Sequence, residues 1–312
     1  MAVALAVSAF PFTAVEAQSP APLVTLHLAA TPDDDVGPVL YAQSAGLFAR
    51  AGLTVVLDRA PSGTVAISGV LAGSYDIVKS SLVNLMSAHV KGIPLTLIAP
   101  AGMYDDATPF AQLLVARDST IHTAKDLEGK LLAVPGLHDI GQVADSAWVE
   151  QHGGDVKSLH FIEFPMSASP AALDEHRFDA VTIVGPAMDA AMATGKYRAL
   201  GPSFSAIAPH FLFSGWIATQ DWVAKHPDVA RRFVRVLADA SAYGNVHHAE
   251  IEPLLAAFTG IPLDVLRKMT RGVYGTVLAP ADVQPLIAAA VKYQMIDASF
   301  PAQELMTTAS SR

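Results

Sequence analysis

The sequence predicts an α/β protein made of two lobes, and three observations support this fold class. The 312 residues suit two domains of ordinary size better than one. Short apolar strands alternate with helical stretches, as in βαβ units around a mostly parallel sheet. A helix followed by an aromatic–aspartate pair and an apolar strand occurs twice, at 71–78 and at 173–184. This internal repeat suggests that both lobes share one architecture.

The elements can be read in chain order from hydrophobic period and capping residues. In the first part we expect strands at 23–28, 54–57, 76–78 and 95–99, and helices opened by Pro38, Ser62 and Ser80–Ser81. The next part repeats the pattern, with strands at 113–116, 131–134, 161–164 and 178–184, a short helix after the capping pair Thr123 and Asp126, and helices near 143–153 and 171–176. After 211–218 helices dominate, at 227–240, 251–259, 263–271 and 281–295.

The late helices predict a discontinuous first lobe, because they would pack back onto the first sheet. We expect lobe 1 at 23–112 plus 216–312 and lobe 2 at 113–215, with strands near Leu113 and Leu212 crossing between them. The apolar run Met1–Val15 precedes Val15-Glu16-Ala17 and predicts a signal peptide at 1–17, although no Lys or Arg precedes the run. The alternative is a buried N-terminal helix, which Pro11 disfavours. We therefore expect a periplasmic protein.

Composition excludes several classes of function. The net charge of -9 and the lack of a Lys/Arg-rich run disfavour nucleic acid and anionic membrane surfaces. The absence of cysteine excludes disulfides, zinc–thiolate sites and thiol nucleophiles. No P-loop, GxSxG or HExxH motif occurs, and His247 with Glu250 makes two metal ligands at most. We expect no catalytic residue, no metal and no cofactor.

Several segments together resemble one known family. They are Ala45-Gly46-Leu47-Phe48, Ser62-Gly63, Gly92-Ile93-Pro94, Lys125-Asp126-Leu127-Glu128-Gly129-Lys130, Trp222-Val223-Ala224-Lys225-His226-Pro227 and Ile296-Asp297. The ordered series, from about Leu23 to Leu305, resembles NMT1/THI5-like and SsuA/TauA-like binding proteins. The resemblance implies a type II periplasmic-binding fold with a ligand cleft between two α/β lobes, and an ABC permease as the membrane partner. Relatives of this kind carry sulfonates, nitrate, thiamine precursors or aromatic compounds.

Ligands of open α/β sheets bind beyond the carboxyl ends of strands, near helix N-termini. The candidate ligand-binding residues in these loops are Thr31, Asp33, Asp35, Ser62, Gly63, Thr64, Lys79, Ser80, Ser81, Tyr104, Gly136, His138 and Gly185. Lys79 and Tyr104 could offer a counter-charge and a ring face, which favours an aromatic or heterocyclic carboxylate as the ligand.

Each of these candidates has a simpler structural interpretation. Ser62 and Ser81 can be helix caps, Tyr104 can pack at the hinge, Lys79 can be a snorkelling surface lysine, and His138 can face solvent. The loop aspartates can be solvated; an aspartate that faces the cleft would instead repel anions and favour a ligand with a donor or a positive group.

The leading functional hypothesis is a monomeric solute-binding receptor of an ABC importer, which catalyses nothing. One alternative is a THI5-like pyrimidine synthase; that resemblance implies a cysteine-rich iron motif, which this sequence lacks. Another is a ligand-sensing domain for a separate signalling partner.

Overall fold

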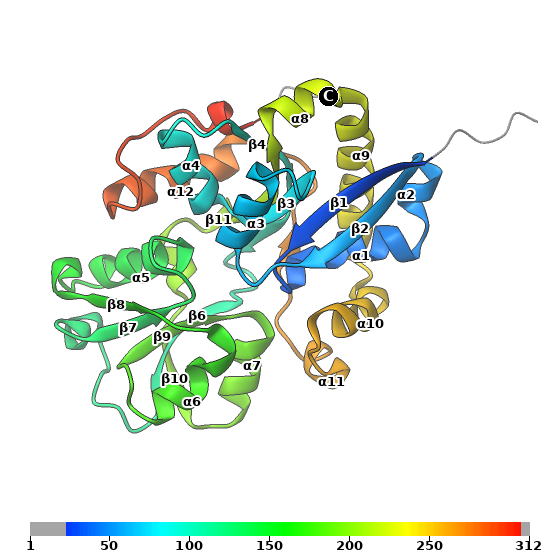
Figure 1. The fold of residues 1–312 in the computed structure, drawn as a ribbon. Coiled ribbons are helices and arrows are strands. Elements are labelled where there is room, and N and C mark those ends of the chain that lie inside the picture. Colours follow the sequence, from blue (N-terminus) through cyan, green and yellow to red (C-terminus); the bar gives the residue numbers. More distant parts are fainter. Residues whose placement is uncertain (1–22, 307–312) are drawn as a thin grey trace, which may run out of the picture.

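The computed structural model describes residues 23–306, apart from the side chains of Ser167 and Pro186. The predicted signal peptide at 1–17 lies outside the described residues. Within the described part, the strands form two five-stranded sheets and one three-stranded sheet. Each large sheet carries its own helices and forms one lobe, called lobe 1 and lobe 2 below (Figure 1). None of the helices in 23–306 combines the length and apolarity needed to cross a bilayer.

Lobe 1 is a sheet covered by helices on both faces. Its strands, in spatial order, are β2 (Leu53–Arg59), β1 (Val24–Ala30), β3 (Ile77–Ser81), β12 (Ser214–Thr219) and β4 (Leu95–Pro100). One face packs on α1 (Gly37–Ser44), α2 (Leu47–Arg50), α9 (Pro227–Gly244), α10 (His248–Thr259) and α11 (Leu263–Leu266). The other face packs on α3 (Gly63–Leu71), α4 (Leu82–Val90) and α12 (Pro280–Lys292). The short helix α8 (Gln220–Lys225) follows β12. The late helices therefore return to the first sheet.

Lobe 2 is a smaller version of the same design. Its strands, in spatial order, are β8 (His160–Glu163), β7 (Leu131–Val134), β9 (Ala180–Val184), β6 (Ala111–Ala116) and β10 (Tyr197–Gly201). Its helices are α5 (Ile140–Gln151), α6 (Ser169–Asp174) and α7 (Gly185–Ala193). In both lobes the first three strands of the order are parallel and the last two pairings are antiparallel. The common architecture that the internal repeat suggested is confirmed.

The aspartate of the repeated aromatic–aspartate pair has the same structural role in both lobes. The Asp76 carboxylate accepts a hydrogen bond of 2.8 Å from the backbone N–H of His27 at β1. The Asp179 carboxylate accepts one of 2.9 Å from the backbone N–H of Leu131 at β7. Each aspartate also donates its own N–H to the carbonyl of that same neighbour. The aromatic–aspartate pair thus ties the start of the central strand to the parallel strand beside it.

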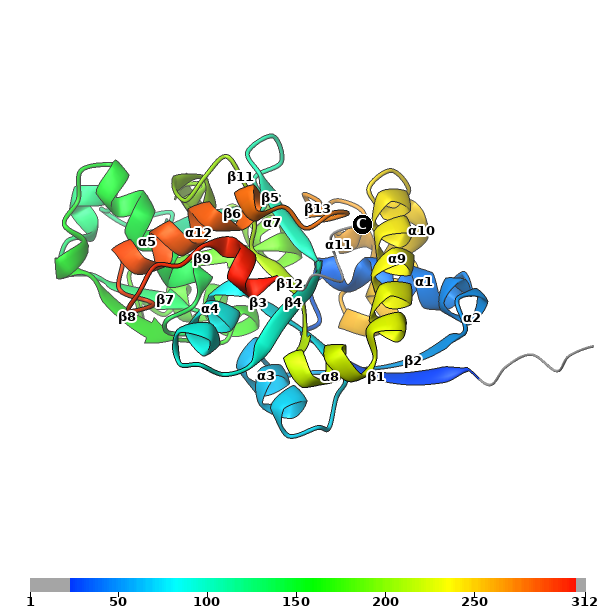
Figure 2. The same ribbon diagram turned by 90° about the horizontal axis from the view of Figure 1, so that it is seen from above.

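Two short strands connect the lobes. β5 (Gly102–Asp105) and β11 (His210–Leu212) run antiparallel, and β13 (Val273–Tyr274) extends them to the third sheet. Seen from above, the three lie together between the lobes (Figure 2). The expected crossing near Leu212 coincides with β11. The other expected crossing, near Leu113, is wrong, because Leu113 is buried inside β6 and pairs with β9 and β10.

Most other expected elements are present, with shifted ends. The capping box of Thr123 and Asp126 opens a 3-10 helix, as predicted. The expected helix 263–271 is only one turn long, since the chain then turns toward β13. The stretch 211–218 is broken at Phe213 into β11 and β12, which belong to different sheets.

Candidate functional site

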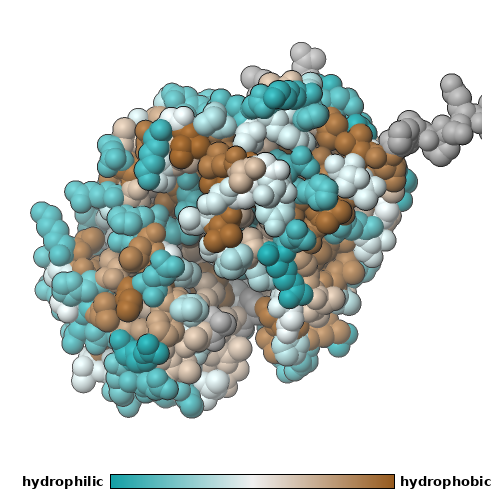
Figure 3. Space-filling model, in the orientation of Figure 1, coloured by the Kyte–Doolittle hydropathy of each residue, from teal (hydrophilic) through white to brown (hydrophobic). Residues whose placement is uncertain are grey.

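The candidate residues come from strand ends that face one another across the two lobes. In lobe 1, β1 and β3 are parallel neighbours, so Thr31, which follows β1, and Ser81, the last residue of β3, lie at adjacent strand ends. In lobe 2, β7 and β9 are parallel neighbours, and their loops begin at Pro135 and Gly185. The surface is hollowed between the lobes (Figure 3). This is the position at which open α/β sheets bind ligands.

Ser81 of lobe 1 and Asp139 of lobe 2 lie close together where the two edges meet, and the Ser81 hydroxyl acts to lower the pKa of the Asp139 carboxylate. Burial outweighs this effect and that of the hydrogen bond from the Ile140 N–H, and raises the pKa of Asp139 above its usual value. The Ile140 N–H lies 2.7 Å from Asp139 Oδ1. Asp139 is therefore both the N-cap of α5 and a contact across the cleft.

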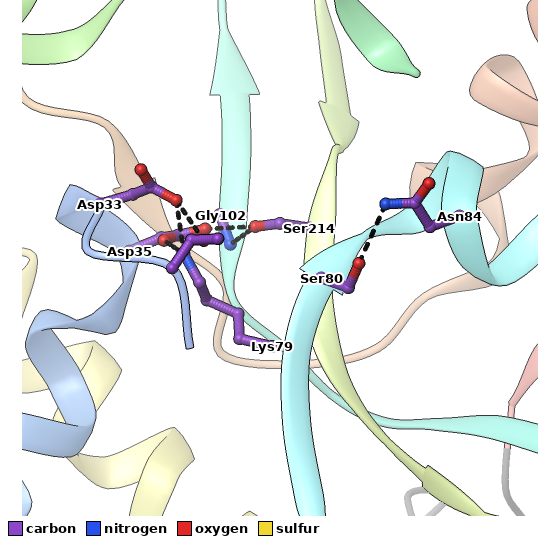
Figure 4. A network of polar contacts seen from close by, with 8 residues as sticks. Asp33, Asp35, Lys79, Ser80, Asn84, Gly102 and Ser214 are labelled. Carbon is purple, nitrogen blue, oxygen red and sulfur yellow. Dashed lines mark hydrogen bonds and ion pairs between the residues drawn. The ribbon is translucent and has the colours of Figure 1, made fainter. Parts of the chain in front are cut away.

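Lys79 is the centre of a buried polar network in lobe 1 (Figure 4). Its side chain is 2% exposed and forms ion pairs with Asp33, at 3.1 Å, and with Asp35. The Asp35 carboxylate also accepts a hydrogen bond from Ser214, whose hydroxyl accepts the Gly102 N–H at 2.9 Å. Burial acts to lower the pKa of Lys79, but the two carboxylates outweigh it and hold this pKa above its usual value. The ammonium group is therefore charged at neutral pH.

This arrangement corrects both interpretations of Lys79. The side chain does not reach solvent, so it is not a snorkelling surface lysine. Two protein carboxylates already contact the ammonium group, so the support that Lys79 gave to a ligand carboxylate is lost. Asp35 is buried with it, whereas the Asp33 side chain is 61% exposed and keeps an open side. Thr31 donates its hydroxyl hydrogen to Asp33 and so orients that carboxylate.

The start of α3 packs tightly against the end of β3. A Cβ atom on Gly63 would lie 2.4 Å from Ser80 Oγ, so a larger residue at this position would have to displace the Ser80 side chain. Ser80 is buried and accepts a hydrogen bond of 3.2 Å from Asn84 Nδ2. Ser80 and Gly63 thus position the cleft edge, and Ser80 has its polar partner within lobe 1.

The serines Ser62 and Ser81 are helix caps, as their structural interpretation predicted. Ser62 Oγ accepts the Val65 N–H at the start of α3, and Ser81 Oγ accepts the Val83 N–H at the start of α4, each at 3.3 Å. Thr64 lies in the first turn of α3 and is exposed. Both helices therefore begin at the edge of the sheet, where a ligand in the cleft would meet their N-termini.

The lobe 2 candidates lie in two tight loops. His138 is exposed and has a φ of 55°, an uncommon conformation for a residue with a side chain; its N–H donates to Gln142 Oε1 at 2.8 Å. Gly136 is half-buried beside Asp139. Gly185 has a φ of 53° and donates its N–H to the Phe110 carbonyl at 2.9 Å. This glycine begins α7 at the hinge side of the cleft.

Tyr104 belongs to the hinge core, which corrects its interpretation as a ring face for the ligand. Its side chain is 0% exposed and its hydroxyl lies 2.7 Å from Ser205 Oγ. The ring contacts Phe110, Phe204 and Phe211, with centroid distances of 5.5 to 5.6 Å. An aromatic cluster therefore packs the strands that connect the lobes.

The list of candidate ligand-binding residues does not include three residues that the structure places here. Asp139 carries a recognisable signal, since an aspartate directly before an apolar-periodic run is a typical N-cap. Ser214 had no such signal, because its partner Asp35 is 179 residues away along the chain. Phe213 is half-buried beside Phe110 and Phe204, and packs against the Cα of Gly102.

Several solved structures that are similar to this chain are named as binding proteins. The periplasmic aliphatic sulphonate binding protein SsuA of Escherichia coli is similar with a TM-score of 0.74 and 18% identity, covering 91% of this chain and 92% of that one. The alkanesulfonate-binding protein SsuA of Xanthomonas axonopodis pv. citri, bound to MOPS, has a TM-score of 0.71 and 18% identity, and the match covers 93% of this chain and 96% of that one. A ligand-binding component of an ABC-type import system from Staphylococcus aureus has a TM-score of 0.78 and 12% identity, and the match covers 93% of this chain and 98% of that one. The predicted type II periplasmic-binding fold is confirmed.

One sequence relative is named as an enzyme. The 4-amino-5-hydroxymethyl-2-methylpyrimidine phosphate synthase of Schizosaccharomyces pombe is 22% identical over 222 residues. The match covers 65% of this chain and 60% of that relative, so the chain spans less than two thirds of its length. The family profile described as NMT1/THI5 like matches residues 33–250, which include the lobe 2 sheet, the lobe 1 sheet apart from β1, and most of the candidate site. The chain therefore belongs to the NMT1/THI5-like family.

Proposed function

We propose that this protein is the solute-binding receptor of an ABC importer, which captures a small organic molecule between its lobes and delivers it to a permease. One observation carries the proposal: two sheets with the same pattern of parallel and antiparallel strands are joined by two short strands, and loops that follow their parallel strands come together at Ser81 and Asp139. A site divided between two lobes can close around a ligand. The solved binding proteins of the same fold support this function and a periplasmic location.

The structure suggests how closure would work. β5 and β11 are short and connect the lobes, so small backbone changes there would rotate one lobe against the other. The Ser81–Asp139 contact lies on the edge that would close. A ligand bound to both lobes shifts the equilibrium toward the closed form by its difference in affinity for the two forms. The closed form would then present the surface that a permease recognises.

The second candidate function is pyrimidine synthesis, which the Schizosaccharomyces pombe relative favours. The resemblance to that enzyme implies a cysteine-rich iron motif, and this sequence contains no cysteine. An assay for pyrimidine phosphate formation by the purified chain separates the two functions. The receptor proposal expects no product, but a stabilising ligand.

Ser81→Ala is expected to weaken ligand binding about tenfold, because it removes a hydroxyl at the cleft edge, while it lowers stability by about 1 kcal/mol through loss of the cap. Thr219→Ala is the matched control. Thr219 caps α8 at 3.1 Å from the Trp222 N–H, and it lies at the opposite end of the sheet from Ser81. Thr219→Ala should cost similar stability without changing affinity.

The ligand for this comparison comes from a thermal-shift screen of sulfonates, nitrate, thiamine precursors, amino acids, aromatic carboxylates and organic cations. At about 100 times Kd, a ligand that binds only the folded protein adds ~2.7 kcal/mol to its stability. Equal affinities of the two variants for a stabilising ligand would place the binding site outside the cleft and refute the proposal.

A further inference from the structure

The loops that form the cleft carry more negative than positive formal charge. The segments 31–37, 62–64, 79–81, 135–139 and 185–186 contain four aspartates and one lysine, Lys79. One of the four, Asp34, is paired with Arg271 at 2.7 Å, outside these segments. The remaining aspartates are Asp33, Asp35 and Asp139. Asp35 is buried with Lys79, so a ligand between the lobes meets the carboxylates of Asp33 and Asp139.

The one lysine cannot serve as the counter-charge of an anionic ligand. Its ammonium group is buried and forms ion pairs with both Asp33 and Asp35. An anion would have to displace a protein carboxylate from a buried ammonium group, which leaves that carboxylate unpaired. The exposed side of Asp33, in contrast, can accept a hydrogen bond from a ligand without breaking any existing contact.

Protein oxygen atoms also occupy most of the helix N-termini that would otherwise attract an anion. Ser62, Ser81 and Asp139 cap α3, α4 and α5. The Asp139 cap is a carboxylate, and an acidic group near a helix N-terminus offsets the positive end of the helix dipole. α7 begins without a side-chain cap, but the Gly185 N–H is already bonded to the Phe110 carbonyl and the next residue is a proline, which has no N–H to donate.

We propose that the cleft binds an organic cation, or a neutral molecule rich in N–H donors, and discriminates against anions such as sulfonates and carboxylates. The donors of the ligand would bind the Asp33 carboxylate of lobe 1 and the Asp139 carboxylate of lobe 2. Like charges brought together disfavour the wrong partner, so the same carboxylates that attract a donor reject an anion. This inference rests on the proposed receptor function and adds the chemical class of its ligand.

The test is a thermal-shift and calorimetric screen of the full chain with a library divided equally among cations, neutral donors and anions. Benzamidinium, benzamide and benzoate form a matched set with nearly the same shape and different charge. Hits are expected among the cations and neutral donors. Asp33→Asn and Asp139→Asn should each weaken a cationic hit at least tenfold. Asp221→Asn is the control, because it removes the same charge from α8, where Asp221 is exposed and paired with Lys225, at 2.8 Å.

The outcomes separate the charge inference from the receptor function. Hits among anions, with affinity unchanged or improved in Asp33→Asn, would overturn the charge inference and leave a receptor. No hit in any class, with all four proteins folded, would contradict the receptor function itself. Equal weakening by Asp33→Asn, Asp139→Asn and Asp221→Asn would show long-range attraction without a cleft site, and would also overturn the inference.

Discussion

Replacing Lys79 by methionine is expected to lower the free energy of unfolding by about 3–5 kcal/mol, which is typical when one partner of a buried ion pair is removed. Methionine fills a similar volume in β3, so the loss comes from charge. Asp35 would remain buried without its ammonium partner, and Asp33 would lose the contact that holds the loop after β1. The same change should also weaken ligand binding, because this loop forms one wall of the cleft.

Urea denaturation of the two proteins measures this effect. Lys91→Met is the matched control, because Lys91 is exposed at the end of α4 and should change stability by less than about 0.5 kcal/mol. Adding Asp35→Asn to Lys79→Met removes the unpaired carboxylate and should restore part of the loss. If Lys79→Met and Lys91→Met have equal midpoints, the buried network contributes nothing to folding.

Asp145→Asn is expected to stabilise the protein at pH 8 by up to roughly 4 kcal/mol, since about 1.4 kcal/mol corresponds to each pKa unit. Burial raises the pKa of Asp145 to about 7, and hydrogen bonds with Thr182 and Ser203 only partly oppose this rise. Among the described residues, Asp145 Oδ2 has no hydrogen-bond partner. An asparagine keeps the shape of the side chain and carries no charge.

The sign of the pH dependence follows from where the proton is bound. Between about pH 4, the usual pKa of an aspartate, and pH 7, the folded chain holds a proton on Asp145 that the unfolded chain has released. The contribution of Asp145 to the free energy of unfolding is therefore fully present below about pH 4 and declines as the pH rises to about 7. The variant should match wild type near pH 4 and exceed it at pH 8.

Denaturation midpoints at several pH values check this prediction. Asp118→Asn serves as the control, since Asp118 is exposed in lobe 2. A stability difference between Asp145→Asn and wild type that does not change from pH 4 to pH 8 would mean that Asp145 is ionised in the fold at all these pH values.

The architecture was predictable because its signals are local. Alternating strands, the caps Ser62 and Ser81, and the repeated aromatic–aspartate pair each depend on a few neighbouring residues. The strand β5 was missed because Gly102–Asp105 is only four residues long and does not alternate. The helix after Leu263 was predicted too long, because apolar period alone does not show where the chain turns into β13.

The candidate site was predictable only as a set of loops. The loop sequences indicate which residues follow strand ends, but not what each side chain contacts. Asp35 lies 44 residues before Lys79, so the neutralisation of that lysine has no local signal. Tyr104 is buried by Phe204 and Phe211, about a hundred residues further along the chain. The ligand preference drawn from Lys79 and Tyr104 therefore loses its support, because the contacts of both side chains are long-range.

The most direct test of the central claim measures the separation of the two lobes with and without ligand. The chain contains no cysteine, so Ser74→Cys in lobe 1 and Lys157→Cys in lobe 2 provide two specific labelling positions, both exposed. Addition of a ligand found in the screen should shorten the fluorescence energy-transfer distance between the labels, with the same midpoint as binding. Tight binding with an unchanged distance would contradict a receptor that closes around its ligand.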